Sequence, residues 1–375
     1  MSETTGTMAR TMARTMADIR SVATASAVAR RSAGLLVAVL MLLSACDGSR
    51  HPGPAPTLEA ARWENFQQRF VHGGQVIDSG NADISHSEGQ GYGMLLAVAA
   101  GDQGAFDRLW RWTSRVLQRR DGLLSWRYAP CPAADTSCVT DSNNASDGDL
   151  LVAWALLRAG DAWGNADYHF AALTIMAAVA EKLVLTHENR TLLLPGEVGF
   201  RHDDAITVNL SYWVFPALQA FHREQPTGPW QALIDSGVAL LDSARFGDAQ
   251  LPPDWLEIGP DSLRPSPRFS TRYGFDAVRI PLYATWAGLA PEDNWRPLKQ
   301  LWQRDPVPAW VDLDDGSTAE YAWSRGMASV ARLVASQPTE GDIGHAPDDA
   351  AAADADYYSQ TLVLLSHLAG AERGS

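Results

Sequence analysis

The stretch GAFDRLWRWTSRVLQ, residues 104–118, carries the pattern that decides the fold of this chain. Its side chains Phe106, Leu109, Trp110 and Leu117 follow the i, i+3, i+4 spacing that brings residues to one face of an α-helix. A helix with one apolar face packs that face on a core. The stretch therefore predicts a helix within a larger helical body.

The same spacing recurs outward from this stretch, between residues 58 and 372. Strand signals are few, and no change of composition divides the segment. We therefore expect one all-α domain at residues 58–372. The pattern predicts about eleven helices, at residues 59–71, 89–101, 104–118, 149–160, 166–185, 207–222, 229–243, 275–288, 294–303, 318–335 and 356–370.

Many helices of medium length in one domain favour either a solenoid or a closed α/α barrel. No strict repeat at a fixed period is present, which disfavours the solenoid. In an α/α barrel the loops at one end form a groove. Polar loop motifs are therefore expected to gather there.

The composition limits the classes of partner. The chain has 375 residues and a net charge of −14. Such an acidic protein repels nucleic acid and anionic membrane surfaces, so we expect no nucleic-acid partner. A neutral or cationic substrate is compatible with this charge, and the alternative is that acidity only keeps the protein soluble. The 14 tryptophans are suited to a core and also to stacking on sugar rings.

The first residues predict export. An apolar run from Leu35 to Leu43 follows two arginines and is too short to span a bilayer, which is typical of a signal peptide. It leads into Cys46 through the sequence LSAC, which resembles the lipobox of bacterial lipoproteins. We expect residues 1–45 to be a lipoprotein-type signal peptide. Its true start codon is expected downstream of Met1, at Met12 or Met16. The alternative is an ordinary secretory signal with an incidental Cys46.

A lipidated Cys46 would begin the mature chain. The proline-rich residues 46–57 then predict a tether. Asp47 follows the cysteine, and in Gram-negative lipoproteins an acidic residue there indicates retention at the inner membrane. We therefore expect a periplasmic protein held at the inner membrane by its lipid alone.

Two further cysteines, Cys131 and Cys138, lie close together in the sequence. An exported protein folds in an oxidising compartment, so a disulfide between them is expected. A zinc site is disfavoured because two further Cys or His ligands are missing nearby.

The first of three acidic motifs is SHSEGQGYGM, residues 85–94, which contains Glu88. Its alternating glycines each disfavour a helix by up to about 1 kcal/mol relative to Ala, so they indicate tight backbone packing beside a polar Glu. A phosphate-binding loop is disfavoured because no Gly-Lys-Ser/Thr follows. The alternative is that Glu88 only caps the next helix.

The second motif is NNASDGD, residues 143–149, which contains Asp147. Its structural alternative is that Ser146 or Asp147 is the N-cap of a helix starting near Leu150. A calcium loop fits less well because Ala145 and Ser146 interrupt the alternation of ligands and no Glu follows at the twelfth position.

The third motif is RYGFDAVRIP, residues 272–281. Asp276 and Arg279 are three residues apart, so they can share one helix face. The alternative is an ordinary ion pair on the surface.

Together the three motifs resemble glycoside hydrolase family 8, in particular the bacterial cellulases associated with cellulose synthesis. They occur in the order of that family, with Val152 a mild departure within the second. The resemblance covers residues 61–370 and also includes the segments NLSYW at 209–213, LPPDW at 251–255 and DYY at 356–358.

The resemblance implies an (α/α)6 barrel with an open cleft and an inverting mechanism. In that mechanism Glu88 is the general acid and Asp276 the general base, while Asp147 binds and distorts the central sugar. The resemblance also implies that the substrate is contacted by Trp126, Tyr212, Arg279, Tyr357 and Tyr358.

The chemistry of glycoside hydrolysis suits these roles. An inverting enzyme needs a carboxylic acid and a carboxylate roughly 6.5–9.5 Å apart, which leaves room for the water that the carboxylate activates. The acid must hold its proton near neutral pH, so we expect a raised pKa for Glu88, from burial or from Asp147. Arg279 would keep Asp276 ionised. No metal or other cofactor is required.

We therefore expect endo-acting hydrolysis of a β-1,4-glucan, with cellulose as the favoured polymer and the cellulose synthase export machinery as a possible neighbour. One alternative is the same fold acting on chitosan, xylan or mixed-linkage glucan. Another is a non-catalytic glycan-binding lipoprotein.

Overall fold

The computed structural model describes residues 56–131, 138–289, 292–336 and 356–373. They all belong to one unit, Pro52–Ser375. The predicted signal peptide, Cys46 and most of the tether lie outside the described residues.

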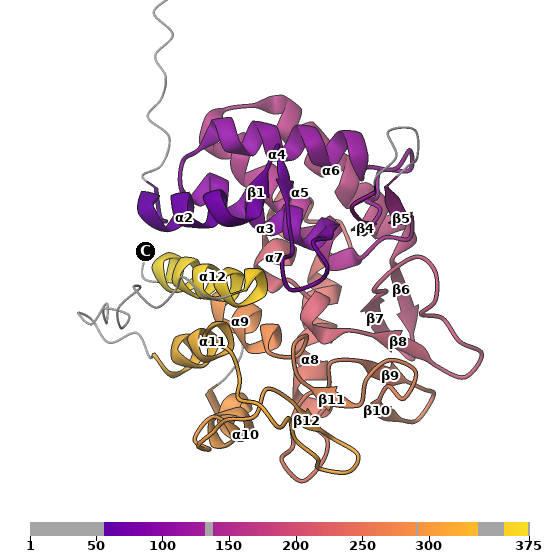
Figure 1. Cartoon of the computed structure of the whole chain (residues 1–375). Helices are drawn as coiled ribbons and strands as arrows, with labels where there is room; N and C mark the ends of the chain where they lie inside the picture. The colour runs from indigo at the N-terminus through magenta and orange to yellow at the C-terminus, as the bar shows by residue number, and fades with distance from the viewer. Residues whose placement is uncertain (1–55, 132–137, 290–291, 337–355, 374–375) are drawn as a thin grey trace, which may run out of the picture. The chain divides into compact units, whose positions relative to one another are not determined.

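Helices dominate the described part of the chain (Figure 1). They match the predicted ranges closely, apart from three that begin later than predicted. The α-helices are α2 (Ala60–Phe70), α3 (Ser87–Ala99), α4 (Gln103–Val116), α5 (Ser146–Trp163), α6 (Ala166–Lys182), α7 (Phe215–Glu224), α8 (Trp230–Ser243), α9 (Arg279–Trp286), α10 (Arg296–Leu301), α11 (Arg325–Ala335) and α12 (Tyr357–Arg373), and the 3-10 helices are η1 (Leu210–Tyr212) and η2 (Glu292–Trp295).

The helix predicted at 207–222 is interrupted in its first half. Residues Ile206–Val208 form strand β8, which pairs with a strand about fifty residues further along the chain. Helix α7 begins only at Phe215, where Pro216 occupies its first turn. Proline suits the first turn because its missing N–H would have no partner there.

The helices predicted at 275–288 and 318–335 also begin late. Two isolated bridges replace the start of the later one, pairing Thr318 with Val311 and Ala322 with Pro308. Helix α11 starts after Ser324, whose hydroxyl accepts a hydrogen bond from the N–H of Met327 at 3.2 Å. Helix α9 starts at Arg279 after a turn that carries Asp276.

Short antiparallel strands fill the connections, and the sequence pattern missed them. A strand of two to four residues is too short to show alternation of apolar and polar positions. The sheets are β1–β2 (Val71–His72, Gln75–Val76), β3–β4–β5 (Ser85–His86, Arg127–Tyr128, Val139–Asp141), β6–β7 (Val184–His187, Arg190–Leu193), β8–β9–β10 (Ile206–Val208, Leu256–Ile258, Leu263–Pro265) and β11–β12 (Arg272–Tyr273, Val311–Asp312).

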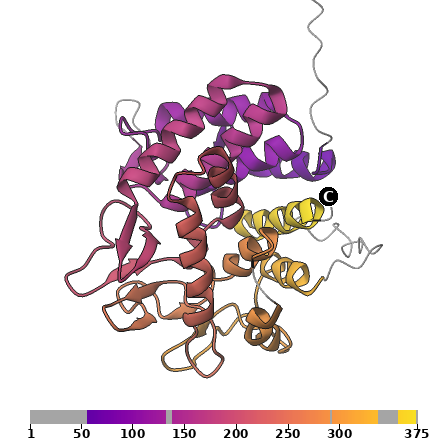
Figure 2. The same ribbon diagram turned by 180° about the vertical axis from the view of Figure 1, so that it is seen from behind.

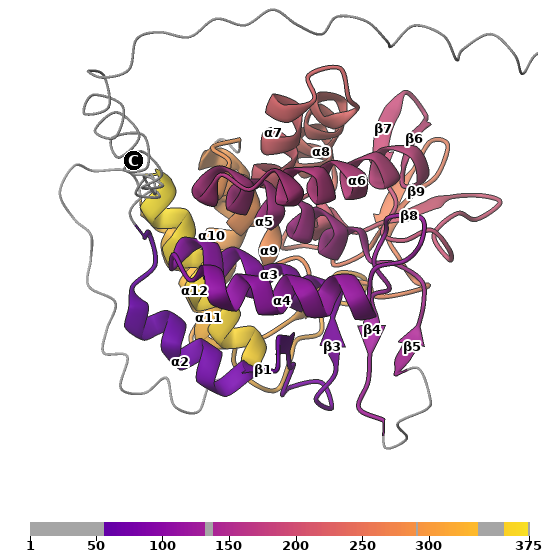
Figure 3. The same cartoon turned by 90° about the horizontal axis from the view of Figure 1, so that it is seen from above.

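Successive helices pack on one another, and the last returns to the first. Helix α3 packs on α4 and α5, α5 on α6 and α7, and α7 on α8 and α9. Helix α9 packs on α11 and α12, and α12 lies against α2 and α3, as the views from behind and above show (Figures 2 and 3). One hydrophobic core joins these helices.

Within the described residues, no helix combines the length and the apolar character needed to cross a bilayer.

Candidate active site

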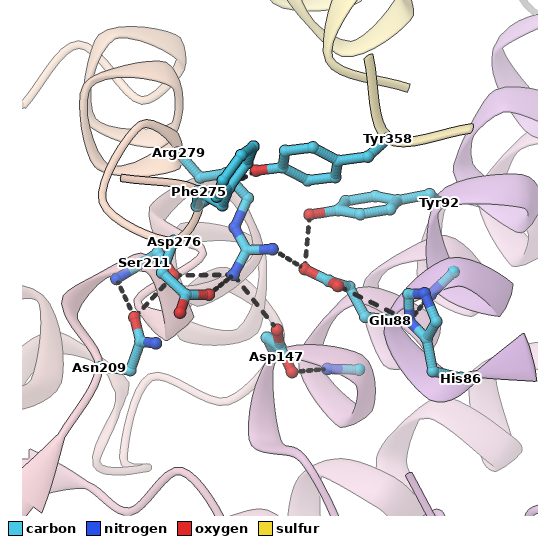
Figure 4. A network of polar contacts seen from close by, with 12 residues as sticks. His86, Glu88, Tyr92, Asp147, Asn209, Ser211, Phe275, Asp276, Arg279 and Tyr358 are labelled. Atoms are coloured by element: carbon cyan, nitrogen blue, oxygen red, sulfur yellow. Dashed lines mark hydrogen bonds and ion pairs between the residues drawn. The ribbon is translucent and has the colours of Figure 1, made fainter. Parts of the chain in front are cut away.

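The three predicted acidic residues converge on one guanidinium (Figure 4). Glu88 lies in the first turn of α3 and Asp147 in the first turn of α5. Asp276 lies in the turn before α9, and Arg279 is the first residue of that helix. Four side chains from three separate segments therefore meet at one point.

Close packing of α3 on α5 brings Glu88 and Asp147 together. A Cβ atom on Gly148 would lie 2.1 Å from the Ser87 hydroxyl oxygen and 2.7 Å from the backbone nitrogen of Glu88. A Cβ atom on Gly91 would lie 2.5 Å from the Cβ of Leu151. Only glycine fits at these contacts, which confirms the predicted tight packing beside Glu88.

Neither carboxylate caps its helix. The N-cap of α3 is His86, whose Nδ1 accepts a hydrogen bond from the N–H of Gly89 at 3.0 Å. The N-cap of α5 is Ala145, without a capping side chain. Asp147 Oδ1 instead accepts the N–H of the next residue, and its Oδ2 lies 3.8 Å from Arg279 Nη2. The capping alternatives for Glu88, Ser146 and Asp147 are therefore wrong.

Arg279 binds the carboxylates of Glu88 and Asp276, and it is only 4% exposed. Its Nη1 donates to Glu88, while Nη2 donates to Asp276 Oδ1 at 2.9 Å and to the Ser211 hydroxyl at 2.9 Å. Burial excludes the alternative of a surface ion pair. The guanidinium lies between Glu88 and Asp276 and keeps their carboxylates apart (Figure 4).

The raised pKa expected for Glu88 is wrong for this arrangement. Burial does raise it, but the guanidinium of Arg279, together with His86, Tyr92 and Asp147, lowers the pKa of Glu88 below its ordinary value. Tyr92 donates its hydroxyl proton to Glu88 Oε1 at 3.0 Å. Hydrogen bonds and positive charge beside a carboxylate favour its ionised form.

The other two carboxyls show the opposite shift. Burial and the charge of Glu88 raise the pKa of Asp147 well above its ordinary value, although Arg279 opposes them. Burial also raises the pKa of Asp276 and outweighs Arg279. Arg279 acts in the expected direction on Asp276, but it does not dominate. Asp147 therefore holds a proton more firmly than Glu88 does.

A family model described as glycosyl hydrolases family 8 matches residues 32–372. The chain belongs to this family. An endoglucanase of Cellulomonas uda is 39% identical to it over 286 residues, 74% of this chain and 78% of the relative. A probable endoglucanase of Novacetimonas hansenii is 37% identical over 332 residues, 85% of this chain and 93% of the relative.

Solved structures of family 8 resemble this one closely. The endo-β-1,4-glucanase of Acetobacter xylinum superimposes with a TM-score of 0.75 and 36% identity, covering 85% of this chain and 99% of that structure. An endoglucanase of Klebsiella pneumoniae, a family 8 glycosyl hydrolase, superimposes with a TM-score of 0.76 and 38% identity, covering 84% of this chain and 99% of that structure.

Three of the five residues expected to contact substrate lie beside the family 8 site and are partly exposed. The backbone of Trp126 bonds to Ser87 at 3.0 Å and to Asn143 at 2.8 Å, within the motifs of Glu88 and Asp147. Tyr212 follows Ser211, which binds Arg279, and burial and then the charges of Asp147, Asp276 and Glu88 raise its pKa well above its ordinary value. Tyr358 donates to the carbonyl of Phe275 next to Asp276 (Figure 4). Arg279, the fourth, is the buried centre described above.

Tyr357 does not have the expected surface position. It is 1% exposed, and its ring packs against those of Phe66, Phe70 and His86. Direct substrate contact by Tyr357 is therefore corrected to a role in the core between α12, α2 and α3. Two adjacent tyrosines at a helix start point their rings in different directions. The sequence alone did not show which of the two is buried.

Several polar residues of the site were missed. Tyr92 links Glu88 to Tyr283 of α9, with 2.7 Å between the two hydroxyl oxygens. Asn209 accepts the Ser211 hydroxyl proton at 2.7 Å, and Ser211 in turn accepts from Arg279. Tyr92 lies four residues after Glu88, which is one helical turn. That spacing was the signal for Tyr92, and the NLSYW segment was the signal for Asn209 and Ser211.

Cys131 and Cys138 form the predicted disulfide, with Cα atoms 5.6 Å apart. The residues between them, 132–137, lie outside the described residues. Among the described ranges, no group of three or more His, Cys, Asp or Glu side chains is arranged to hold a metal ion.

Proposed function

We propose that this chain hydrolyses internal β-1,4-glucosidic bonds of a cellulose-like glucan with inversion of configuration. One observation carries the proposal: Glu88 and Asp276 lie on either side of the buried guanidinium of Arg279, with Asp147 beside them. Inverting hydrolysis needs two carboxyl groups that face the scissile bond from opposite sides and are held apart.

Glu88 acts as the general acid and protonates the leaving oxygen. Its lowered pKa leaves it ionised while Arg279 binds it, and the raised pKa of Asp147 leaves the proton there. A sugar that draws Glu88 away from Arg279 removes the main stabilisation of its carboxylate. The proton then passes from Asp147 to Glu88, because the two carboxyls share it as a coupled pair.

Asp276 acts as the general base and takes a proton from the attacking water. Arg279 favours its ionised form and binds its Oδ1. Tyr212, next to Ser211 and in ring contact with Trp255, is assigned to orient the sugar or the water. Trp126 and Tyr358 are assigned to sugar contacts.

The helices close an (α/α)6 barrel in this proposal. Support comes from the packing of α3 on α5, α5 on α7, α7 on α9 and α9 on α12, because the return of α12 to α3 completes a circle. The acidic residues lie at or just before the N-terminal ends of α3, α5 and α9, which belong to this circle.

Export, a lipid on Cys46 and retention at the inner membrane are part of the same proposal. An enzyme so placed is suited to trimming glucan beside a cellulose synthase export machine. The test is fractionation of cells that express the full chain or its Cys46→Ser variant. We expect the wild type in the membrane fraction and the variant in the soluble periplasmic fraction. Equal distribution of the two would contradict the lipid anchor.

The catalytic proposal is tested with the body after Cys46 on carboxymethylcellulose. We expect a rapid fall in viscosity with few new reducing ends, which is the behaviour of an endo-acting enzyme. Glu88→Gln should abolish hydrolysis and keep glucan binding, while Glu181→Gln, an exposed residue of α6, should leave both unchanged.

The product anomer then tests inversion, by NMR immediately after cleavage. An α-anomer from a β-linked glucan supports the arrangement of Glu88 and Asp276, and a β-anomer contradicts it. Folded protein that cleaves chitosan or xylan in place of cellulose would overturn the substrate, and binding without any cleavage would overturn the enzyme.

A further inference from the structure

Asp254 is a buried carboxylate in the LPPDW segment that no catalytic role accounts for. It is 8% exposed, and its Oδ1 accepts three backbone N–H groups. They come from Gly274 at 2.9 Å, Asp276 at 3.1 Å and Ala277 at 2.8 Å. One oxygen of Asp254 therefore accepts three hydrogen bonds from the backbone of the turn that carries the proposed general base.

The contact is close and is supported from both sides. A Cβ atom on Gly274 would lie 3.0 Å from Asp254 Oδ2, so a larger residue there would press on the Asp254 carboxylate. The backbone N–H of Asp254 donates to the carbonyl of Arg272 at 2.6 Å. These bonds tie the LPPDW segment to the start of α9, about twenty residues later in the chain.

The neighbouring Trp255 interacts with the side chain of Asp276. It lies beside the side chain of Asp276 and lowers the pKa of that carboxyl. Its ring also meets that of Tyr212 edge to face, with centroids 5.9 Å apart. Asp254 therefore holds the backbone of the base while Trp255 contacts its side chain.

We infer that Asp254 is a positioning residue that fixes the backbone of Asp276 so that its carboxylate faces the attacking water. The inference rests on the proposed function, because it assigns a partner to the proposed base. It concerns the rate of the chemical step. A displacement of about 1 Å in a catalytic group can lower the rate about a hundredfold.

The charges around Asp254 make its role depend on pH. Burial and the charge of Asp276 raise its pKa to about 7, although the three N–H groups oppose them. A further titratable group beside it is the phenol of Tyr273, from β11, whose pKa is raised by burial and also by the charge of Asp254. As pH falls through about 7, Asp254 gains a proton and its charge-assisted bonds to the turn weaken.

The experiment compares the pH profiles of kcat and KM for the wild type, Asp254→Asn and Asp254→Ala. Asn keeps an oxygen acceptor but cannot titrate. We expect Asp254→Asn to lower kcat at neutral pH about tenfold, with KM unchanged, and Asp254→Ala to lower it about a hundredfold. The acid limb of kcat should move to lower pH by about one unit in Asp254→Asn, because only Asp276 then titrates there.

Asp149→Asn is the matched control. Asp149 is also a buried aspartate with a pKa raised to about 7, but it bonds the N–H of Leu124 at 2.8 Å and the amide of Asn144 at 2.7 Å. Its substitution should leave the acid limb in place.

The outcomes separate the inference from the proposed function. An active wild type with an unchanged profile in Asp254→Asn overturns the inference alone. The same holds if Asp254→Asn only loses stability and its acid limb does not move. A wild type inactive on every glucan overturns the proposed function and the inference with it. If Asp254→Ala does not fold, Asp254→Asn decides.

Discussion

At the scale of single residues, the site is governed by one positive charge among three carboxyls. Arg279 can compensate the ionised forms of Glu88 and Asp276, and burial makes a third negative charge unfavourable. Asp147 therefore binds a proton more readily than Glu88 does. The hydrogen bond from Tyr92 then decides how strongly Glu88 competes for that proton.

Replacing Tyr92 with Phe should extend activity to higher pH. The Tyr92 hydroxyl stabilises the carboxylate of Glu88 and lowers its pKa, so its loss raises that pKa. A general acid must be protonated, so the alkaline limb of kcat/KM should move up by about one pH unit. Tyr283→Phe, which removes a partner of Tyr92 but no bond to Glu88, should move the limb less. A shift to lower pH in Tyr92→Phe would contradict this account.

At the scale of elements, the crossing of α3 and α5 sets the distance between Glu88, the proposed general acid, and Asp147. Gly148 occupies the contact point, next to Asp147 and against Ser87 and Glu88. The helix starts are held by the backbone of Trp126, which bonds both to Ser87 and to Asn143. Any side chain at Gly148 would separate the two helices at the catalytic acids.

Replacing Gly148 with Ala should therefore harm both stability and activity. Forcing a methyl group into this contact is expected to destabilise the fold by about 1–3 kcal/mol. Displacement of Glu88 should lower kcat about a hundredfold. Urea unfolding and the viscosity assay measure the two effects.

Gly104→Ala in α4 is the matched control for this substitution. Its added Cβ would meet nothing closer than 3.6 Å, so it should stabilise the helix slightly and leave kcat unchanged. Equal activity of the two variants would show that the helix crossing does not set the geometry of the acids.

At the scale of the whole molecule, buried carboxyls make stability depend on pH. Burial raises the pKa of Asp149 to about 7, and its charge-assisted bonds do not compensate fully. A folded-state pKa above the unfolded value means that folding favours the protonated form. This stability is present in full below about pH 4 and is lost as pH rises through about 7.

Asp149→Asn should therefore reduce the fall in the free energy of unfolding between pH 5 and pH 8. Asn cannot ionise, so its burial carries the same free energy at both values. Part of the fall in the free energy of unfolding should remain in the variant, because the pKa of Asp254 is also raised to about 7. Urea unfolding at both pH values measures the difference, with the exposed Asp235→Asn of α8 expected to match the wild type. An unchanged fall in Asp149→Asn would mean that Asp149 is already ionised at pH 5.

Local features of this protein followed from the sequence. The helical spacing around Phe106 and Leu109 located α4, because periodicity within one helix depends only on neighbours in the chain. The predicted family is confirmed. It could be predicted because its three acidic motifs are short and local. The disulfide between Cys131 and Cys138 was predictable for the same reason.

The tertiary structure decided the features that depend on distant partners. Strand β8 is stabilised by pairing with β9, about fifty residues later in the chain. The local pattern does not contain this partner, and it predicted a helix there. Arg279, 191 residues from Glu88, reversed the expected shift in the pKa of that acid. Tyr357 proved to be buried by residues of α2, and Asp254 acquired its contacts from a turn twenty residues away. Charge and burial act through space, so a pattern along the chain does not contain them.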